Sequence, residues 1–224
     1  MTRPLAVLRP EPGNTATADR VEALGLQAIR LPLFAVRALS WTPPDPADHD
    51  ALLLTSANAL RFAGLDLADL LSLPVLAVGE KTAEAARLAG FDVMAAGNAD
   101  AVAMLALASA RGLSRVLHLG GRDRSVEPNG PVTRAIPVYA SEEVPVAAER
   151  IERLRGGAMA LLHSARAAAR LGELVDAHGI ARSEIAIAAL SPAVAAAAGA
   201  GWATIAIAAV PTDAALIAAA FTRD

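Results

Sequence analysis

Hydroxyl-bearing and small residues directly follow apolar runs at three places in the chain, where they could bind an anion. The turns are Thr55-Ser56-Ala57-Asn58, Gly79-Glu80-Lys81-Thr82-Ala83 and Ser164-Ala165-Arg166. Each apolar run predicts a strand and each following segment a helix, so that free N–H groups and the helix dipole favour negative charge at the turn. N-capping, which contributes about 1 kcal/mol, is the better explanation of any single turn. Equivalent turns in two repeats favour a shared anionic ligand.

Two other features could contact a ligand. Tyr139, the only tyrosine, ends a predicted strand at a proposed domain crossover. Its phenol could donate a hydrogen bond into a cleft, and packing in the linker explains it equally well. The run Gly120-Gly121-Arg122-Asp123-Arg124 could bind an anion through backbone N–H groups and arginines, or it could be a solvated turn.

The histidines indicate no metal site. None of the four has metal-ligand spacing with another histidine or a carboxylate. His118 lies inside a predicted strand, as a core or edge residue. His163 ends a strand beside Ser164, at the edge where ligand sites of α/β proteins form, so contact with a ligand stays one of two alternatives. Nucleotide-binding glycine motifs and a Ser–His–Asp set are absent from the sequence.

Composition narrows the class of protein. The chain has 224 residues, 54% of them hydrophobic and 3% aromatic, and a net charge of −3. This charge, without a cluster of Lys and Arg, argues against nucleic acid as a partner. The chain has no cysteine, which excludes disulfides and thiolate chemistry and fits a cytoplasmic protein. The first apolar run is too short for a signal peptide, and we expect no membrane association.

Short apolar runs alternate with helical patterns along the whole chain. We expect strands near 4–8, 27–31, 51–55, 75–78, 92–95, 115–119, 132–139, 158–162, 185–189 and 203–208. Helices are expected near 14–24, 57–71, 80–89, 99–110, 145–155, 165–178, 193–200 and 212–221. Strands without strict alternation are typical of parallel sheets covered by helices on both faces. The fold class is therefore α/β, with doubly wound, flavodoxin-like parallel sheets.

The chain also contains an internal repeat. The segment from Ala51 through Gly79 to Gly90-Phe91 resembles the segment from Ala160 through Ser191 to Gly201-Trp202. Duplicated units commonly form paired domains with a ligand between them. Crossovers after the matching Phe34 and Tyr139 strands make one domain discontinuous. We expect domain 1 at 1–34 and 143–224, domain 2 at 41–135, and linker strands at 35–40 and 136–142.

These landmarks together resemble the uroporphyrinogen-III synthase family over almost the whole chain. Val7-Leu8-Arg9-Pro10 is similar to its opening Thr-Arg-Pro turn, and Thr55 to Leu60 to its Thr-Ser-x-Asn-Ala-Val segment. Val78 to Ala83 matches its first Val-Gly-x-x-Thr-Ala signature, Val138-Tyr139 its Val-Tyr pair, and Pro211-Thr212 its late Pro-Thr. The order and spacing of these motifs are more specific than any one of them.

The resemblance implies two α/β domains joined by a two-stranded linker, with the active site in the cleft between them. It implies a monomeric, cofactor-free lyase that converts hydroxymethylbilane, a linear tetrapyrrole with eight carboxylates, to uroporphyrinogen III with loss of water. Tyr139 would assist departure of the hydroxyl. The expected substrate-binding residues are Arg9, Thr55, Ser56, Asn58, Gly79, Lys81, Thr82, His163, Ser164 and Ser191.

The sequence departs from the family pattern at three places. Val194 replaces the threonine of the second Gly-Pro-x-Thr-Ala turn, and His163 replaces a threonine of the second Thr-Ser pair. The stretch from Gly120 to Gly130 is short, so the helix expected there is trimmed or absent. The missing hydroxyl at 194 leaves an alternative, a non-catalytic two-domain module that binds an anionic metabolite by hinge closure.

Overall fold

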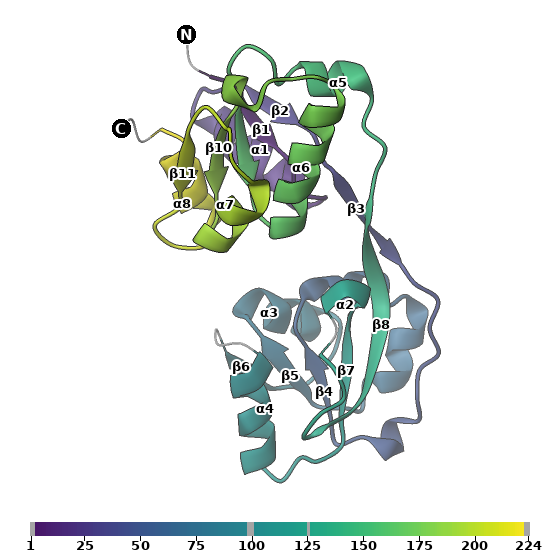
Figure 1. The fold of residues 1–224 in the computed structure, drawn as a ribbon. Helices are drawn as coiled ribbons and strands as arrows, with labels where there is room; N and C mark the ends of the chain where they lie inside the picture. Colours follow the sequence, from purple (N-terminus) through teal and green to yellow (C-terminus); the bar gives the residue numbers. More distant parts are fainter. Residues whose placement is uncertain (1–2, 98–100, 125, 222–224) are drawn as a thin grey trace. The chain divides into compact units, whose positions relative to one another are not determined.

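The computed structural model describes residues 3–97, 101–124 and 126–221 (Figure 1). The strands are β1 (Leu5–Val7), β2 (Ala28–Arg30), β3 (Phe34–Ala38), β4 (Ala51–Leu54), β5 (Val75–Val78), β6 (Val93–Gly97), β7 (Val116–Gly121), β8 (Val132–Glu143), β9 (Met159–Leu162), β10 (Ala186–Ala189) and β11 (Ile205–Ile207). The α-helices are α1 (Gly13–Ala23), α2 (Ala57–Phe62), α3 (Glu80–Leu88), α4 (Ala101–Ala110), α5 (Ala148–Glu152), α6 (Ala165–Ala177), α7 (Pro192–Ala198) and α8 (Asp213–Ala219). Short 3-10 turns span Pro46–Asp48, Leu65–Leu70, Arg122–Arg124 and Arg182–Glu184.

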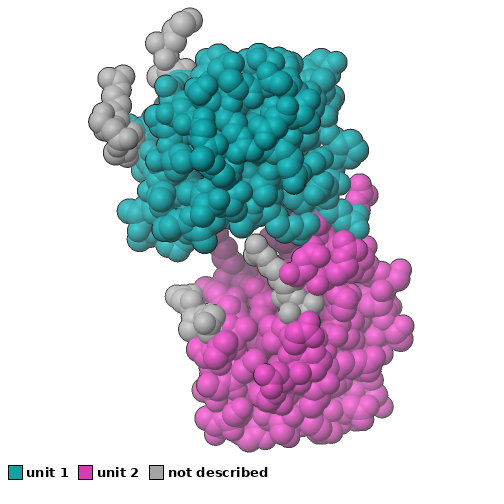
Figure 2. All heavy atoms as spheres, in the orientation of Figure 1, with its two compact units in different colours: residues 1–35, 142–224 teal, residues 36–141 magenta. Residues whose placement is uncertain are grey.

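The chain divides into two compact units, one of them discontinuous (Figure 2). Unit 1 comprises Met1–Ala35 and Glu142–Asp224, and unit 2 comprises Val36–Ser141. The chain passes from one unit to the other within β3 and again within β8, and these two strands are neighbours. Whether each unit is also an independently folding domain with the limits expected from the sequence stays a prediction.

The sheet of unit 1 has the strand order β11-β10-β9-β1-β2, and all of its printed pairings are parallel. Successive side chains of each strand point to opposite faces of the sheet. Helices cover both of these faces. Ala6, Ala160 and Ile187 pack with residues of α5, α6 and α7. Leu5 and Met159 face the other way, toward α1 and α8. The apolar runs of the sequence are therefore strands buried on both faces.

The second sheet has the order β3-β8-β7-β4-β5-β6, and β4, β5, β6, β7 and β8 pair in parallel. Leu52 and Leu54 pack on the side of α2 and α3, and Leu53 packs on the side of α4. With parallel strands and helices on both faces of each sheet, the prediction of an α/β fold with doubly wound parallel sheets is confirmed.

Three predicted helices differ from the observed ones. The helix expected over 57–71 ends at Phe62, because Gly64 has a positive φ of 74° that a continuing α-helix excludes, and a 3-10 turn follows. The helix expected over 145–155 is reduced to Ala148–Glu152. The helix expected from 99 begins, within the described residues, at Ala101, and its predicted first residues lie outside them. Between the end of β7 at Gly121 and Gly130, the described residues contain one 3-10 turn, Arg122–Arg124, and no α-helix.

Candidate functional site

Each sheet has one position where neighbouring parallel strands send their connections in opposite directions. In unit 1 this switch point lies between β1 and β9, and in the second sheet it lies between β4 and β7. Ligands of open α/β sheets bind in the crevice beyond the carboxyl ends of the strands at such a point. Arg9 and His163 follow β1 and β9, and Thr55 follows β4. Residues chosen from motifs therefore lie at both switch points.

A charged cluster occupies the switch point of unit 1. Its centre is Asp213, the first residue of α8, which was predicted only as part of a helix start. The Asp213 carboxylate accepts hydrogen bonds from Thr17 Oγ1 at 2.8 Å, Arg20 Nη1 at 2.6 Å and His163 Nε2 at 2.7 Å. Arg9 Nη1 lies 3.6 Å from the same carboxylate. Residues from three other segments, the turn after β1, helix α1 and the turn after β9, thus meet at Asp213.

The cluster fixes the charges of its members. Burial favours the neutral form of Asp213, but the bonds from His163, Thr17 and Arg20 outweigh it and lower the pKa of this carboxyl. Burial lowers the pKa of His163, while its bond to Asp213 opposes the shift and the nearby Arg9 charge adds to it. A positive Arg9, with its side chain 35% exposed, remains available to an anionic ligand.

Asn14 shapes the turn that carries Arg9. The expected role of Asn14-Thr15 was to start a helix, yet α1 begins at Gly13, and Asn14 is fully buried. Asn14 Nδ2 donates to the carbonyl oxygens of Val7 at 2.7 Å and of Arg9 at 3.0 Å. These bonds hold the end of β1 against the start of α1. No pattern in the sequence distinguished this role from capping.

At the switch point of the second sheet, Thr55 meets His118. Thr55 Oγ1 lies 3.3 Å from His118 Nε2, and the Val126 N–H donates to His118 Nδ1 at 3.2 Å. His118 was expected to be a core or an edge residue of a strand, and it is fully buried in β7. Its link to Thr55 was not predicted, because that link depends on β7 lying beside β4.

The three predicted serines all cap helices. Ser56 Oγ accepts from the Asn58 N–H at 3.2 Å, Ser164 Oγ from the Ala167 N–H at 3.3 Å, and Ser191 Oγ from the Val194 N–H at 3.4 Å. A capping oxygen uses a lone pair and keeps its own proton for a second partner. The capping explanation and the binding explanation of these turns are therefore compatible.

The Gly79 turn carries three predicted binding residues with different exposure. Gly79 precedes α3 with a φ of 88°, a conformation that glycine adopts without strain. Lys81 is exposed, whereas Thr82, in the first turn of α3, is only 5% exposed. The Gly79 N–H donates to the Gly97 carbonyl at 2.7 Å, and the Gly79 carbonyl accepts from the N–H groups of Thr82 and Ala83. The turn therefore presents the Lys81 ammonium more openly than the Thr82 hydroxyl or the Gly79 backbone.

Tyr139 lies on β8 directly opposite Gly121 of β7. A Cβ atom at Gly121 would stand 2.8 Å from Cε2 of the Tyr139 ring, so the ring occupies the space that this glycine leaves. On its other side the ring contacts Phe62, with 6.3 Å between the ring centroids. Tyr139 is half-buried, so a fixed ring coexists with an accessible edge.

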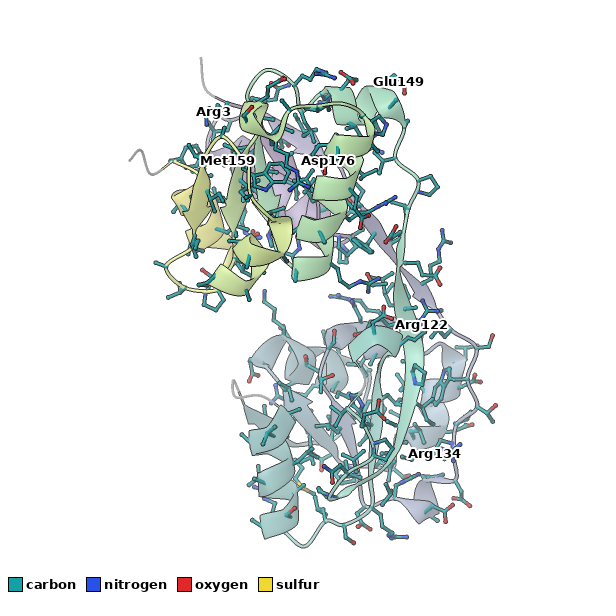
Figure 3. The ribbon with its side chains drawn as sticks, viewed as in Figure 1. Arg3, Arg122, Arg134, Glu149, Met159 and Asp176 are labelled. Atoms are coloured by element: carbon teal, nitrogen blue, oxygen red, sulfur yellow. The ribbon has the colours of Figure 1, made fainter. Side chains whose placement is uncertain are left out.

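The Gly120–Arg124 run consists of the end of β7 and one 3-10 turn. Gly120 and Gly121 are buried and make room for the rings of His118 and Tyr139. Close ring packing therefore explains both glycines. Figure 3 labels Arg122 just beyond this end of β7, and Arg134, which pairs with Leu117, nearer the other end of the strand.

The predicted residues divide between the units. Arg9, His163, Ser164 and Ser191 follow β1, β9 and β10, adjacent strands of one sheet. The remaining predicted residues belong to unit 2, at Thr55, Ser56, Asn58, Gly79, Lys81, Thr82 and Tyr139. In the part of the chain that the structure describes, no group of three or more metal-ligating side chains could hold a metal ion. No described helix combines the length and apolar character needed to span a membrane.

Two doubly wound α/β sheets, one in each compact unit, define a two-unit α/β protein with polar side chains at the switch point of each sheet. The family model of uroporphyrinogen-III synthase HemD matches residues 15–218. The chain belongs to the uroporphyrinogen-III synthase family. The function predicted from the sequence, that of a uroporphyrinogen-III synthase acting in tetrapyrrole synthesis on a small-molecule tetrapyrrole, is confirmed, and nothing favours the non-catalytic alternative.

The chain is also similar to solved structures. The chain is similar to a uroporphyrinogen-III synthetase from Helicobacter pylori, at 16% identity and a TM-score of 0.65, with 97% of each chain covered. A mutant uroporphyrinogen III synthase from the extremely thermophilic bacterium Thermus thermophilus is 18% identical, with a TM-score of 0.48 and 91% of this chain and 92% of that chain covered. The first of these supports the fold. No curated protein matches the chain significantly.

Proposed function

We propose that the protein is a carbon–oxygen lyase that closes hydroxymethylbilane to uroporphyrinogen III, as a cytoplasmic monomer without a cofactor. The C–O bond of the hydroxymethyl group on ring A breaks, and the oxygen leaves as water. Ring D, an electron-rich pyrrole, attacks the methylene carbon of the resulting azafulvene to give a spiro intermediate. Reopening and closure invert ring D, so the balance is one substrate to one product plus water.

One observation carries this proposal: both switch points bear donors suited to carboxylates, in a chain of this family. In unit 1 the donors are Arg9 and the capping serine Ser164 at the switch point, with the capping serine Ser191 beyond the neighbouring strand β10. In unit 2 they are Thr55 and Ser56 at the switch point, with the exposed Lys81 beyond the neighbouring strand β5. A substrate with eight carboxylates needs many such donors, and charge-assisted hydrogen bonds orient it more strongly than neutral ones.

Tyr139 is the residue proposed to act on the reacting group. Its phenol donates a hydrogen bond to the hydroxyl of ring A as the C–O bond breaks, which stabilises the departing oxygen. Packing between Gly121 and Phe62 limits the ring to few orientations. The remaining requirement is to fold the chain of pyrroles so that ring D meets the azafulvene, a matter of proximity and exclusion of water.

The product isomer tests this function. Hydroxymethylbilane generated enzymatically closes by itself to the type I isomer, so the products are oxidised to porphyrins and separated by chromatography. We expect type III in the presence of the protein. Type I alone, with protein shown to be folded by circular dichroism, overturns the proposal.

A Tyr139→Phe variant tests the role of the phenol. The ring and its packing remain, and only the donor is lost. We expect kcat to fall about a hundredfold, within the range of general acid contributions, while KM changes little. A variant with unchanged kcat removes Tyr139 from the mechanism but leaves the synthase activity itself established by the isomer analysis.

A further inference from the structure

The hydrogen bonds of His118 determine which of its ring nitrogens carries a proton. The Val126 N–H can only donate, and it donates to Nδ1 at 3.2 Å. Nδ1 must therefore present a lone pair, because a proton on it would face the amide proton. A neutral imidazole without a proton on Nδ1 carries one on Nε2. Val126 thus selects the Nε2–H tautomer.

The environment of the ring keeps it neutral. His118 is fully buried between neighbouring strands, and burial lowers its pKa to about 4. Gly120 lies against the ring, and a Cβ atom there would stand 2.5 Å from Cε1 and 2.8 Å from Nε2. The absence of a side chain at Gly120 therefore lets the ring lie in this position and reach Thr55.

The consequence reaches the Thr55 hydroxyl. Nε2–H is a donor, so at 3.3 Å Thr55 Oγ1 is its acceptor. One lone pair of Oγ1 is then occupied, and the hydroxyl proton turns away from the ring. The Thr55 hydroxyl has no other hydrogen bond to the described residues, and the residue is half-buried. Its proton is thus available to an acceptor outside the protein.

We propose that His118 is a positioning residue, which through the chain Val126 N–H to His118 to Thr55 aims the Thr55 hydroxyl proton at a carboxylate of the substrate. Without His118, Thr55 could turn its proton inward or rotate, and a carboxylate would meet an oxygen lone pair for part of the time. This inference rests on the proposed function, because it assigns Thr55 a substrate carboxylate as partner.

Two substitutions of His118 separate the hydrogen bond from Val126 from the hydrogen bond to Thr55. In His118→Asn the amide oxygen stands near the place of Nδ1 and keeps the bond from Val126, but no donor reaches Thr55. In His118→Gln the amide nitrogen stands near the place of Nε2 and keeps the donor to Thr55. We expect the Asn variant to raise KM about tenfold with kcat little changed, and the Gln variant to stay near the parent value.

A double-mutant cycle with Thr55→Val adds the second readout. This substitution removes the hydroxyl but keeps the shape of the side chain. If His118 acts through Thr55, the His118→Asn change has no further effect on KM in the Thr55→Val background. Equal KM values for the Asn and Gln variants, or additive effects in the cycle, overturn the inference.

Tautomer analysis keeps the inference testable if the variants do not fold. Long-range proton–nitrogen NMR spectra of the uniformly labelled parent protein distinguish the two tautomers. The chain has four histidines, and the signal that is missing from the spectrum of His118→Gln or His118→Asn belongs to His118. If both variants fail to fold, the spectrum of a labelled Thr55→Val protein identifies the His118 ring, because its Nε2 signal shifts when the Thr55 acceptor is lost. We expect a neutral Nε2–H tautomer at pH 7, and an Nδ1–H tautomer overturns the inference.

The failure of this inference differs from failure of the proposed function. If the parent protein yields only the type I isomer, the proposed function fails whatever the tautomer. If it yields type III and the Asn and Gln variants behave alike, the function stands and the positioning role of His118 falls.

Discussion

The ring of Tyr139 fills the space that Gly121 leaves by having no side chain. The two residues face each other across the parallel pair β7 and β8, and a Cβ atom at Gly121 would lie 2.8 Å from Cε2 and 2.9 Å from Cζ of the ring. Gly121 has no positive φ, so its backbone does not require glycine. The requirement for glycine at this position therefore comes from the tyrosine ring alone.

Gly121→Ala should consequently move the ring without straining the backbone. Contacts below 3.0 Å cannot persist, so Tyr139 must rotate away from its place against Phe62. We expect kcat to fall about tenfold or more, since displacement of a catalytic group by about 1 Å costs up to a hundredfold. Because Tyr139 is the only tyrosine, carbon-13 labelling of tyrosine yields one ring signal that reports the displacement directly.

The matched control is Gly97→Ala, at the end of β6 in the same sheet. There the nearest atom to an added Cβ is the flexible Met104 methyl at 3.3 Å, and the Tyr139 ring is not among the near atoms. The tyrosine signal and kcat should stay at the parent values. A Gly121→Ala protein with an unmoved signal and full kcat would show that the ring position does not depend on this glycine.

Asp213→Asn should weaken the fold of unit 1. The amide keeps the shape of the carboxylate but leaves Arg9, Arg20 and His163 without their shared anion. Asp213 is 17% exposed, but Arg9 and Arg20 are 35% and 53% exposed, so we expect the loss of their shared anion to cost about 1 to 3 kcal/mol. Urea unfolding at pH 7 measures the loss. As a control, Asp176→Asn removes the more exposed partner of Arg182 and should lower the free energy of unfolding much less, because an exposed ion pair is screened by water.

The buried neutral His118 should make stability depend on pH. Its pKa is 6.5 when unfolded and about 4 when folded, so the unfolded state binds the proton first as pH falls. This contribution to stability is complete above pH 6.5 and decreases as pH falls toward 4, by about 3 kcal/mol in total.

The difference in free energy of unfolding between the parent and His118→Gln isolates the contribution of His118, because the other titrating groups contribute equally to both proteins. We expect the free energy of unfolding of the parent, relative to the variant, to fall by about 3 kcal/mol from pH 6.5 to pH 4. A constant difference across this window would mean that His118 titrates alike in both states.

The strands could be predicted from the sequence because a strand that is buried on both faces is a short, continuous apolar run. The run at Val75–Val78 was assigned its observed limits, and it is buried between α-helices on both sides. The helix expected over 57–71 was wrong in its second half, because apolar residues continue past Gly64 into a 3-10 turn with helix-like spacing. A glycine in such a pattern is compatible with either outcome until its φ is known.

The candidate site was predictable only where it lies next to a strand in sequence. Thr55, Ser164 and Ser191 follow strands directly, so the turns could be identified locally. Asp213 and His118 contact these turns through the order of the strands and helices in space, which no local pattern encodes. Sequence reasoning therefore found the residues at the carboxyl ends of the strands and missed those that orient them.

Val194, one of the positions where the sequence departs from the family pattern, allows a test of what this departure changes. It stands where the family pattern has threonine, and it is 8% exposed, packed in the apolar core of unit 1, with its N–H bonded to Ser191 Oγ. Restoring the hydroxyl with Val194→Thr keeps the volume but places a polar group among apolar neighbours. We expect a loss of about 1 to 2 kcal/mol in unfolding free energy and less than about a twofold change in KM. A fall in KM of about tenfold instead would show that this helix start approaches a carboxylate closely enough for the threonine to bind it.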